Sequence, residues 1–212
     1  MSKSPVSISL SREFRSHHFE KEIIYLCKKD KDLIPLFVNY KNFKGFSRPK
    51  NFPGLARLII EQQLSVASAN AIFFKLKNTL GRFSATNILK TNRTQLKKCG
   101  LSRQKILYLK TLAEKCTNGD LSFTFVNKLS DEKIMEELIK IKGIGPWTAQ
   151  CYMLACLKRS DIWPVKDLGL QEAVKRLKKL KIRPNENEME EISSSWKPYR
   201  STVANVLWAS YD

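Results

Sequence analysis

Negative charge, paired cysteines and long apolar runs are all scarce in this 212-residue sequence. The five cysteines are widely scattered, and none belongs to a C-x-x-C pair or a cluster-ligand run, which argues against a disulfide framework, structural zinc and an iron–sulfur cluster. Reduced thiols of this kind are typical of a cytosolic or nuclear protein. No apolar run approaches the length of a membrane span, and the N-terminus lacks the apolar core of a signal peptide, so we expect no membrane association.

The shortage of acidic residues leaves a large positive charge. Asp and Glu number 20 against 38 Lys and Arg, which gives a formal charge of +18. Such an excess favours a polyanionic partner, nucleic acid first and an anionic membrane surface second. Solvated helix faces in a lysine-rich proteome account for part of it. The hydrophobic content of 42% is ordinary for a globular protein, and the length suits one domain or two small lobes that share a cleft.

Strand-like alternation is confined to residues 6–10, and nearly every other periodic segment predicts a helix. The sequence therefore predicts an all-α protein. We expect two helices in 18–40, broken near 28–32, and two in 54–80 that meet at 62–65. The remaining predicted helices are 94–99, 102–117, 131–140, 146–157, 168–180, 188–195 and 199–211.

A tight hairpin is predicted where the sequence reads KGIGP at 142–146. Its two glycines reach backbone angles closed to other residues and carry no Cβ to obstruct an incoming group, and the proline suits the first turn of a helix. The free N–H groups of such a helix N-terminus bind phosphate. A plain turn between helices explains a G-x-G about equally well. The candidate phosphate ligands are Lys142, Gly143, Gly145 and Thr148.

Asp167 precedes the predicted helix 168–180. Its simplest role is that of an N-cap, which the sequence alone favours. The helix N-terminus and the adjacent Lys166 would also favour the ionised carboxylate. An ionised carboxylate stabilises an oxocarbenium-like sugar or activates a water, and that role is compatible with capping.

Tryptophan and tyrosine are concentrated in the last third of the chain, and two adjacent glutamines, Gln62 and Gln63, interrupt an otherwise apolar helix. Aromatic side chains mostly pack in cores; the alternative is stacking on a flipped, positively charged base. The glutamines could lie at the tip of a helix junction and fill the gap that a flipped base leaves in a duplex. The aromatic candidates are Trp147, Tyr152, Trp163, Trp196, Tyr199 and Trp208.

Four motifs together resemble the helix-hairpin-helix (HhH-GPD) DNA glycosylases, and within them the 3-methyladenine DNA glycosylase II group. They are FPGLARLIIEQQLSVASA at 52–69, LIKIKGIGPWTA at 138–149, DIWPVKD at 161–167 and WKPYRSTVANVLW at 196–208. Their order and spacing match the family over about residues 52–210, which makes the resemblance specific.

The resemblance implies an all-α, two-lobed fold with a DNA-binding cleft between the lobes. We expect residues 1–50 to form an N-terminal helical segment that packs with the C-terminal lobe. Residues 51–212 would form the glycosylase region, with the hairpin at 139–149 and the catalytic segment at 161–168.

The resemblance also implies roles for individual residues. Asp167 would be the catalytic carboxylate, and Gln63 or Leu64 would enter the duplex. The base pocket would contain Trp147, Tyr152 and Trp208. The backbone carbonyls of Ile139, Ile141 and Ile144 would hold a monovalent cation, Na⁺ or K⁺, and no other cofactor would be required.

Trp147 bears on the reaction type. Relatives that also cut the strand carry a lysine nucleophile at the fifth place of a G-x-G-x-K pattern, and Trp147 occupies that place here. Without the amine no Schiff base with the sugar can form there. The resemblance therefore implies a monofunctional glycosylase that removes alkylated bases of the 3-methyladenine and 7-methylguanine type. Cys151, which stands where some members have an aromatic pocket residue, suggests a different set of damaged bases.

The expected partner is double-stranded DNA with alkylated bases, and we expect a monomer. The location would be the bacterial cytoplasm, associated with the nucleoid, or the nucleus of a eukaryote. Two alternatives remain open: a non-enzymatic helix-hairpin-helix protein that binds damaged DNA, and a glycosylase/lyase for oxidised bases.

Overall fold

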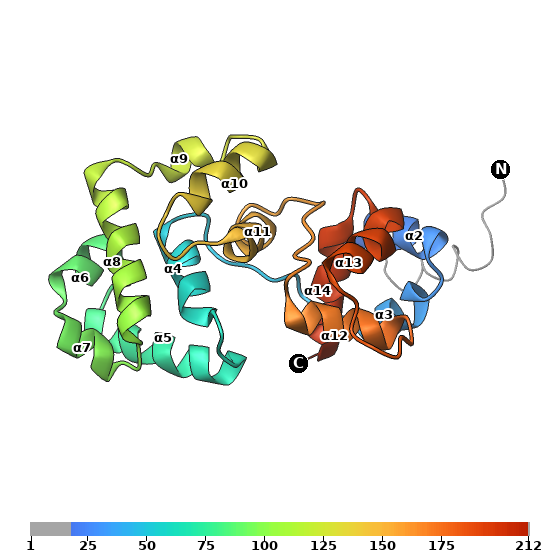
Figure 1. The fold of residues 1–212 in the computed structure, drawn as a ribbon, viewed down its shortest axis with the longest axis horizontal. Coiled ribbons are helices and arrows are strands. Elements are labelled where there is room, and N and C mark those ends of the chain that lie inside the picture. The colour runs from blue at the N-terminus through green and yellow to red at the C-terminus, as the bar shows by residue number, and fades with distance from the viewer. Residues whose placement is uncertain (1–17, 212) are drawn as a thin grey trace. The chain divides into compact units, whose positions relative to one another are not determined.

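The computed structural model describes residues 18–211, and every regular element in that range is a helix (Figure 1). The predicted all-α class is confirmed for these residues; the short alternation at 6–10 lies outside them. None of the helices between residues 18 and 211 has the length and hydrophobicity to span a lipid bilayer.

The described chain forms two compact units. The central unit comprises residues 47–158, and the terminal unit combines 18–46 with 159–211. The segment 51–212 is therefore shared between both units.

The central unit is built around helix α4 (Phe52–Glu61), which is buried along most of its length because its sequence is almost continuously apolar. Helix α4 packs against α5, α8 and α11. The buried charge of Arg57 is compensated by Glu61, whose Oε1 accepts from Nε at 2.7 Å. The other helices of this unit are α5 (Val66–Leu80), α6 (Ala85–Lys90), α7 (Arg93–Lys98), α8 (Arg103–Asn118), α9 (Phe123–Val126), α10 (Asp131–Ile139) and α11 (Pro146–Ala155).

Short polar side chains set where these helices begin. The N-cap side chain accepts a hydrogen bond from the third helical N–H in five of them, which satisfies an amide that the helix leaves unpaired. The caps are Ser65, Ser84, Asn92, Ser102 and Ser130. Helices α6 and α9 were not predicted, because they are too short to show a helical period; the cap residue Ser84 is the local signal for α6.

The terminal unit packs α14 (Arg200–Tyr211) against α12 (Leu168–Leu177) and α3 (Leu33–Asn39). It also contains α2 (Glu20–Lys29), α13 (Glu186–Ser193) and the 3₁₀ turn Ser194–Trp196. The predicted break between α2 and α3 is confirmed.

Helix α12 ends at Leu177, three residues before the predicted end. Lys179 adopts a left-handed conformation with φ +53°, and the Leu180 N–H donates to the Lys175 carbonyl. This 6→1 hydrogen bond terminates the helix in the manner of a Schellman motif.

Asp30, at the end of α2, ties distant parts of the terminal unit together. Its Oδ2 accepts from Lys178 Nζ and from Trp196 Nε1, both at 2.7 Å, and Trp196 is completely buried. Burial alone would raise the pKa of Asp30. The hydrogen bonds from Lys178, Trp196 and the Asp32 N–H, together with the charge of Lys178, outweigh burial, and the pKa lies below its ordinary value.

Replacing Asp30 with Asn should lower the free energy of unfolding at pH 7 by about 1–3 kcal/mol, since a charge-assisted pair and part of the Trp196 hydrogen bond are lost. Because the folded-state pKa of Asp30 is lowered, its stabilisation is present above the unfolded value of about 3.9 and is lost as the pH falls through the folded value. Urea unfolding followed by tryptophan fluorescence at pH 7 and at pH 3 measures both effects.

The matched control is Asp32→Asn. Asp32 accepts from the same Lys178 Nζ at 2.8 Å, but its side chain is 56% exposed, so its removal should cost less than about 1 kcal/mol. Equal losses for the two variants, or an Asp30→Asn deficit that persists undiminished at pH 3, would contradict the role assigned to Asp30.

Candidate functional site

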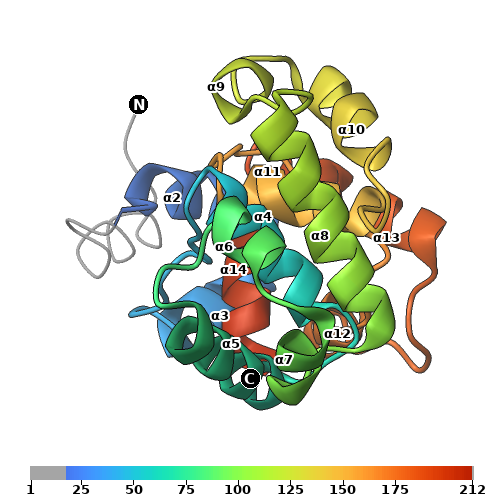
Figure 2. The same ribbon diagram turned by 90° about the vertical axis from the view of Figure 1, so that its left-hand side faces the viewer.

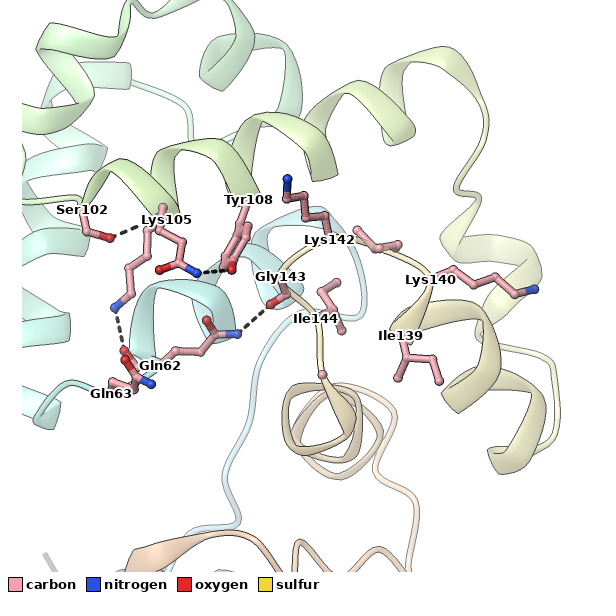
Figure 3. Close-up of a pocket in the computed structure, with 13 residues that line it drawn as sticks. Gln62, Gln63, Ser102, Lys105, Tyr108, Ile139, Lys140, Lys142, Gly143 and Ile144 are labelled. Atoms are coloured by element: carbon pink, nitrogen blue, oxygen red, sulfur yellow. Dashed lines mark hydrogen bonds between the residues drawn. The ribbon is translucent and has the colours of Figure 1, made fainter.

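Helices α10 and α11 flank the predicted hairpin, which runs from Lys140 to the N-cap Gly145. Gly143 has a φ of +92°, the left-handed region that favours glycine. A Cβ at this position would overlap the ring of Tyr108 on α8, so the backbone lies directly against that ring (Figure 3). Gly143 is therefore required by the fold itself. Tyr108 was not foreseen from the sequence, because it lies 35 residues away with no pattern connecting the two.

Gln62 fastens the hairpin to the end of α4. Its Nε2 donates to the Gly143 carbonyl (Figure 3) and to Thr148 Oγ1, both at 2.9 Å. The oddly placed polar residue on an apolar helix thus supplies two hydrogen bonds between segments more than 80 residues apart in sequence. It holds the α4–α5 turn and the hairpin in a defined arrangement.

Lys105 of α8 holds the same turn from its other side. Its Nζ donates to the carbonyls of Ile60 and Gln62, both at 2.7 Å, where α4 ends and leaves carbonyls without helical partners. Partial burial lowers the pKa of this amine.

These residues surround a surface pocket of about 470 Å³. Its wall includes the hairpin, the α4–α5 turn and one face of α8, and Gln104 of α8 is hydrogen-bonded to Tyr108 there. The residues that line it are Gln62, Gln63, Ser102, Gln104, Lys105, Tyr108 and Ile139 to Gly145.

Gln63 and Leu64, the predicted duplex-inserting residues, lie at the turn between α4 and α5. Both are exposed, Leu64 to 39%, and Gln63 has a left-handed backbone with φ +54°. A non-glycine residue in this region is held there by its surroundings. Here the preceding residue, Gln62, is fixed through its side chain by Gly143 and through its carbonyl by Lys105. The choice between the two side chains remains a prediction.

The candidate phosphate ligands differ in their exposure to solvent. Lys142 is exposed, and Gly145 is exposed and offers no side-chain cap to α11. Gly145 has an ordinary φ of −98°, and a Cβ there would meet nothing within 4 Å. Thr148, in contrast, is buried with its hydroxyl bonded to Gln62, so its side chain fastens the hairpin instead of facing an incoming phosphate.

The carbonyls assigned to a cation belong to the same turn. Ile139 ends α10, and a helix leaves the carbonyls of its last turn without internal partners. The Ile141 carbonyl accepts the Ile144 N–H at 2.9 Å and retains a second lone pair. Neutral carbonyl oxygens fit Na⁺ or K⁺. Elsewhere in residues 18–211 no group of three or more His, Cys, Asp or Glu could hold a metal ion.

Asp167 lies in the terminal unit and is the N-cap of α12. Its Oδ1 accepts from the Leu170 N–H at 2.7 Å, so the predicted capping role is confirmed. The same oxygen accepts from Trp208 Nε1 at 3.2 Å. Lys166, which the sequence placed beside the carboxylate, instead pairs with Glu186, its Nζ 3.6 Å from Oε2.

Trp208, on α14, is therefore in direct contact with the carboxylate. Its half-buried ring meets Phe46 edge to face, with the ring centroids 5.8 Å apart. The Phe46 N–H in turn donates to Asn205 Oδ1 on α14. Phe46 was missed from the sequence because it lies in a basic loop 162 residues before Trp208.

The other aromatic candidates have different positions. Trp147, the second residue of α11, is partly exposed. Tyr152 is fully buried and donates to Asn127 Oδ1 at 2.8 Å, so it fills the core of the central unit and has no exposed face for a base; burial raises its pKa. Trp163 and Trp196 are buried against each other in the terminal unit. Cys151 is also buried.

The structure thus places the predicted site residues in two groups. The hairpin, the α4–α5 turn and Trp147 belong to the central unit, whereas Asp167 and Trp208 belong to the terminal unit.

Comparison with known proteins relates both groups to one family. Residues 56–198 match the model of the HhH-GPD superfamily of base excision DNA repair proteins. The chain is similar to DNA-3-methyladenine glycosylase 1 of Schizosaccharomyces pombe, with 31% identity over 84% of this chain and 80% of that protein. It is also similar to the DNA-3-methyladenine glycosylase of Saccharomyces cerevisiae, with 28% identity over 96% of this chain and 84% of the relative. The solved structure of S. pombe 3-methyladenine DNA glycosylase (Mag1) in complex with abasic DNA matches with a TM-score of 0.84 and 30% identity, over 90% of this chain and 96% of that one.

The two hairpin glycines should respond differently to alanine. Gly143→Ala should lower the free energy of unfolding by about 1–3 kcal/mol, because it combines a left-handed backbone with overlap on the Tyr108 ring. Gly145→Ala should change it by less than about 0.5 kcal/mol, because the position is open and its φ is ordinary. Urea denaturation measures both.

The double variant Gly143→Ala/Tyr108→Ala separates the causes of the Gly143 effect. Removing the ring should restore the stability that Gly143→Ala loses through overlap, and it should leave the loss that comes from backbone strain. A Gly143→Ala protein as stable as the unsubstituted one would contradict the packing described for the hairpin.

Proposed function

The chain belongs to the HhH-GPD superfamily of base excision DNA repair proteins, and we propose that it is a monofunctional DNA glycosylase that releases alkylated bases and leaves an abasic site. The observation that carries the proposal is the anchored carboxylate of Asp167, whose Oδ1 is held by the Leu170 and Trp208 N–H groups. A carboxylate with a defined position is what stabilisation of a sugar cation requires.

Alkylated purines of the 3-methyladenine and 7-methylguanine type carry a positive charge and are good leaving groups. The protein's part is then to hold the extruded nucleotide and to oppose the positive charge that develops on the sugar as the N-glycosidic bond breaks. In this proposal Asp167 supplies the negative charge, and the half-buried ring of Trp208 and the partly exposed ring of Trp147 offer faces to the cationic base. Water then completes the hydrolysis at the sugar.

The hairpin would hold the DNA backbone on either side of the extruded nucleotide. Gly145 allows a phosphate to approach the start of α11, and Lys142 adds charge. A monovalent cation held by the carbonyls of Ile139, Ile141 and Ile144 would supply further positive charge to the same phosphate. The turn at Gln63 and Leu64 would fill the space that the extruded nucleotide leaves in the duplex.

The absence of an amine at Trp147 supports base release without strand cleavage, because a Schiff base at that place needs a lysine. The partner proposed is double-stranded DNA with alkylated bases, bound by a monomer. Such an enzyme would work where the DNA is, in the bacterial nucleoid or the eukaryotic nucleus.

Asp167→Asn tests the catalytic role. Asn retains an oxygen that can accept from Leu170 and Trp208, so the α12 cap should survive and the melting temperature should change little. Loss of the negative charge should slow base release by roughly 10²-fold or more. The assay incubates methylated DNA with each protein and measures free 3-methyladenine and 7-methylguanine.

The same assay distinguishes the alternatives. Strand cleavage by the unsubstituted protein without added base or heat would favour a glycosylase/lyase. Binding without base release by either protein would favour a non-enzymatic damaged-DNA-binding module. Undiminished release by Asp167→Asn would remove Asp167 from the chemistry.

Gly145→Ala tests the phosphate grip. Since the substitution should leave stability unchanged, weaker DNA binding would come from the obstructed approach to the start of α11. We expect a higher dissociation constant for duplex DNA in fluorescence anisotropy, and an affinity of the unsubstituted protein that falls steeply with salt. Unchanged binding by Gly145→Ala would show that phosphate does not approach there.

A further inference from the structure

One quarter of the chain, in a single continuous segment, contains basic residues and no acidic residue. Residues 62–113 contain ten Lys and Arg and not one Asp or Glu. This segment forms α5, α6, α7 and most of α8 in the central unit. More than half of the formal charge of +18 therefore lies in about fifty consecutive residues.

Two of these ten charges have structural roles, and three others gather in a groove. Lys105 caps α4, and Lys110 donates to the carbonyls of Ile88, Leu89 and Thr91 at the end of α6. A groove of about 780 Å³ lies along α7 and the start of α8, which lie side by side in both views (Figures 1 and 2). It is lined by Arg93, Thr94, Lys97, Arg103, Gln104, Ile106 and Leu107.

The cations of this groove are exposed and have no internal counter-charge. Arg93 and Lys97 are four residues apart and so share a face of α7, and Arg103 begins α8. Within the part of the chain that the structure describes, none of the three forms an ion pair, and no acidic side chain lines the groove. Like charges held together in this way repel one another, and a bound polyanion relieves that repulsion.

The shape and position of the groove favour a nucleic-acid backbone over other anions. Leu107, 39% exposed, and Ile106 add apolar surface to a lining that also carries the cations, which suits the alternation of sugar carbons and phosphates. Gln104 lines both this groove and the hairpin pocket, so the two are contiguous. A duplex bound at the hairpin would thus extend along the groove.

We propose that the groove of Arg93, Lys97 and Arg103 is a second DNA-binding surface, which takes the sugar–phosphate backbone beyond the segment held by the hairpin. The inference rests on one part of the proposed function, namely that DNA is the partner. It adds phosphate contacts that carry affinity and no sequence information.

The triple variant Arg93→Gln/Lys97→Gln/Arg103→Gln tests the groove. Each lost phosphate contact should reduce the slope of log K against log salt by about 0.9, so the slope for undamaged duplex should fall by roughly 2–3 and the affinity at low salt should fall with it. Fluorescence anisotropy over a range of salt concentrations measures the slope. Since the three side chains are exposed, the melting temperature should not change; Arg103→Gln alone, with an expected fall of about 1, provides the result if the triple variant proves unstable.

The matched control is Lys21→Gln/Lys28→Gln/Lys31→Gln, which removes three exposed positive charges from the terminal unit. Its slope should stay close to that of the unsubstituted protein. An unchanged slope in the groove variant, or an equal fall in the control, would overturn the inference, since the groove would then contribute nothing beyond net charge.

The groove and the glycosylase proposal can fail separately. If the unsubstituted protein releases alkylated bases and the groove variant keeps its salt slope, the groove inference is wrong and the proposed activity stands. If no base is released but the slope falls only in the groove variant, the groove binds DNA in a protein that is not a glycosylase.

Discussion

The two hydrogen bonds from the Gln62 side chain connect the parts of the central unit on which its proposed role depends. Gln62 Nε2 donates to the Gly143 carbonyl and to Thr148 Oγ1, and so fixes the hairpin against the end of α4. The ring of Tyr108 lies where a Cβ at Gly143 would be. Because both contacts act on the same turn, the hairpin has little freedom to rearrange, and an exposed position such as Gly145 is presented in a defined geometry.

Residues that shape the hairpin differ in exposure from residues that would touch DNA. Gly143 and Thr148 are committed to contacts within the protein, whereas Gly145 and Lys142 are exposed and serve no evident structural need. A substitution at Gly143 or Thr148 is therefore expected to alter the fold, whereas a substitution at Gly145 or Lys142 is expected to alter only the binding of a ligand. Tyr152 belongs with the structural group, since it is fully buried and bonded to Asn127.

In the terminal unit Asp167 is the N-cap of α12 and is also the residue proposed for the chemistry, two roles that the sequence indicated to be compatible. Asp167 caps α12 through Leu170 and also accepts from Trp208. The cap orients the carboxylate because a helix N-terminus fixes the position of its acceptor, and the indole N–H restricts it further. Helix capping and the proposed chemistry thus require the same conformation of Asp167, so one conformation can serve both.

Local chemistry in the sequence determined the helices, their caps and the hairpin. Asp167 predicted the start of α12, the charged run at 28–32 predicted the break between α2 and α3, and KGIGP predicted the turn at 142–146, because capping, charge and glycine conformation act over a few residues. Only the tertiary structure decided which side chains serve the site. Tyr108 against Gly143, Gln62 across to Thr148 and Phe46 against Trp208 join segments separated by 35 to 162 residues, and no periodicity spans such separations, since these contacts arise from the packing of helices already formed.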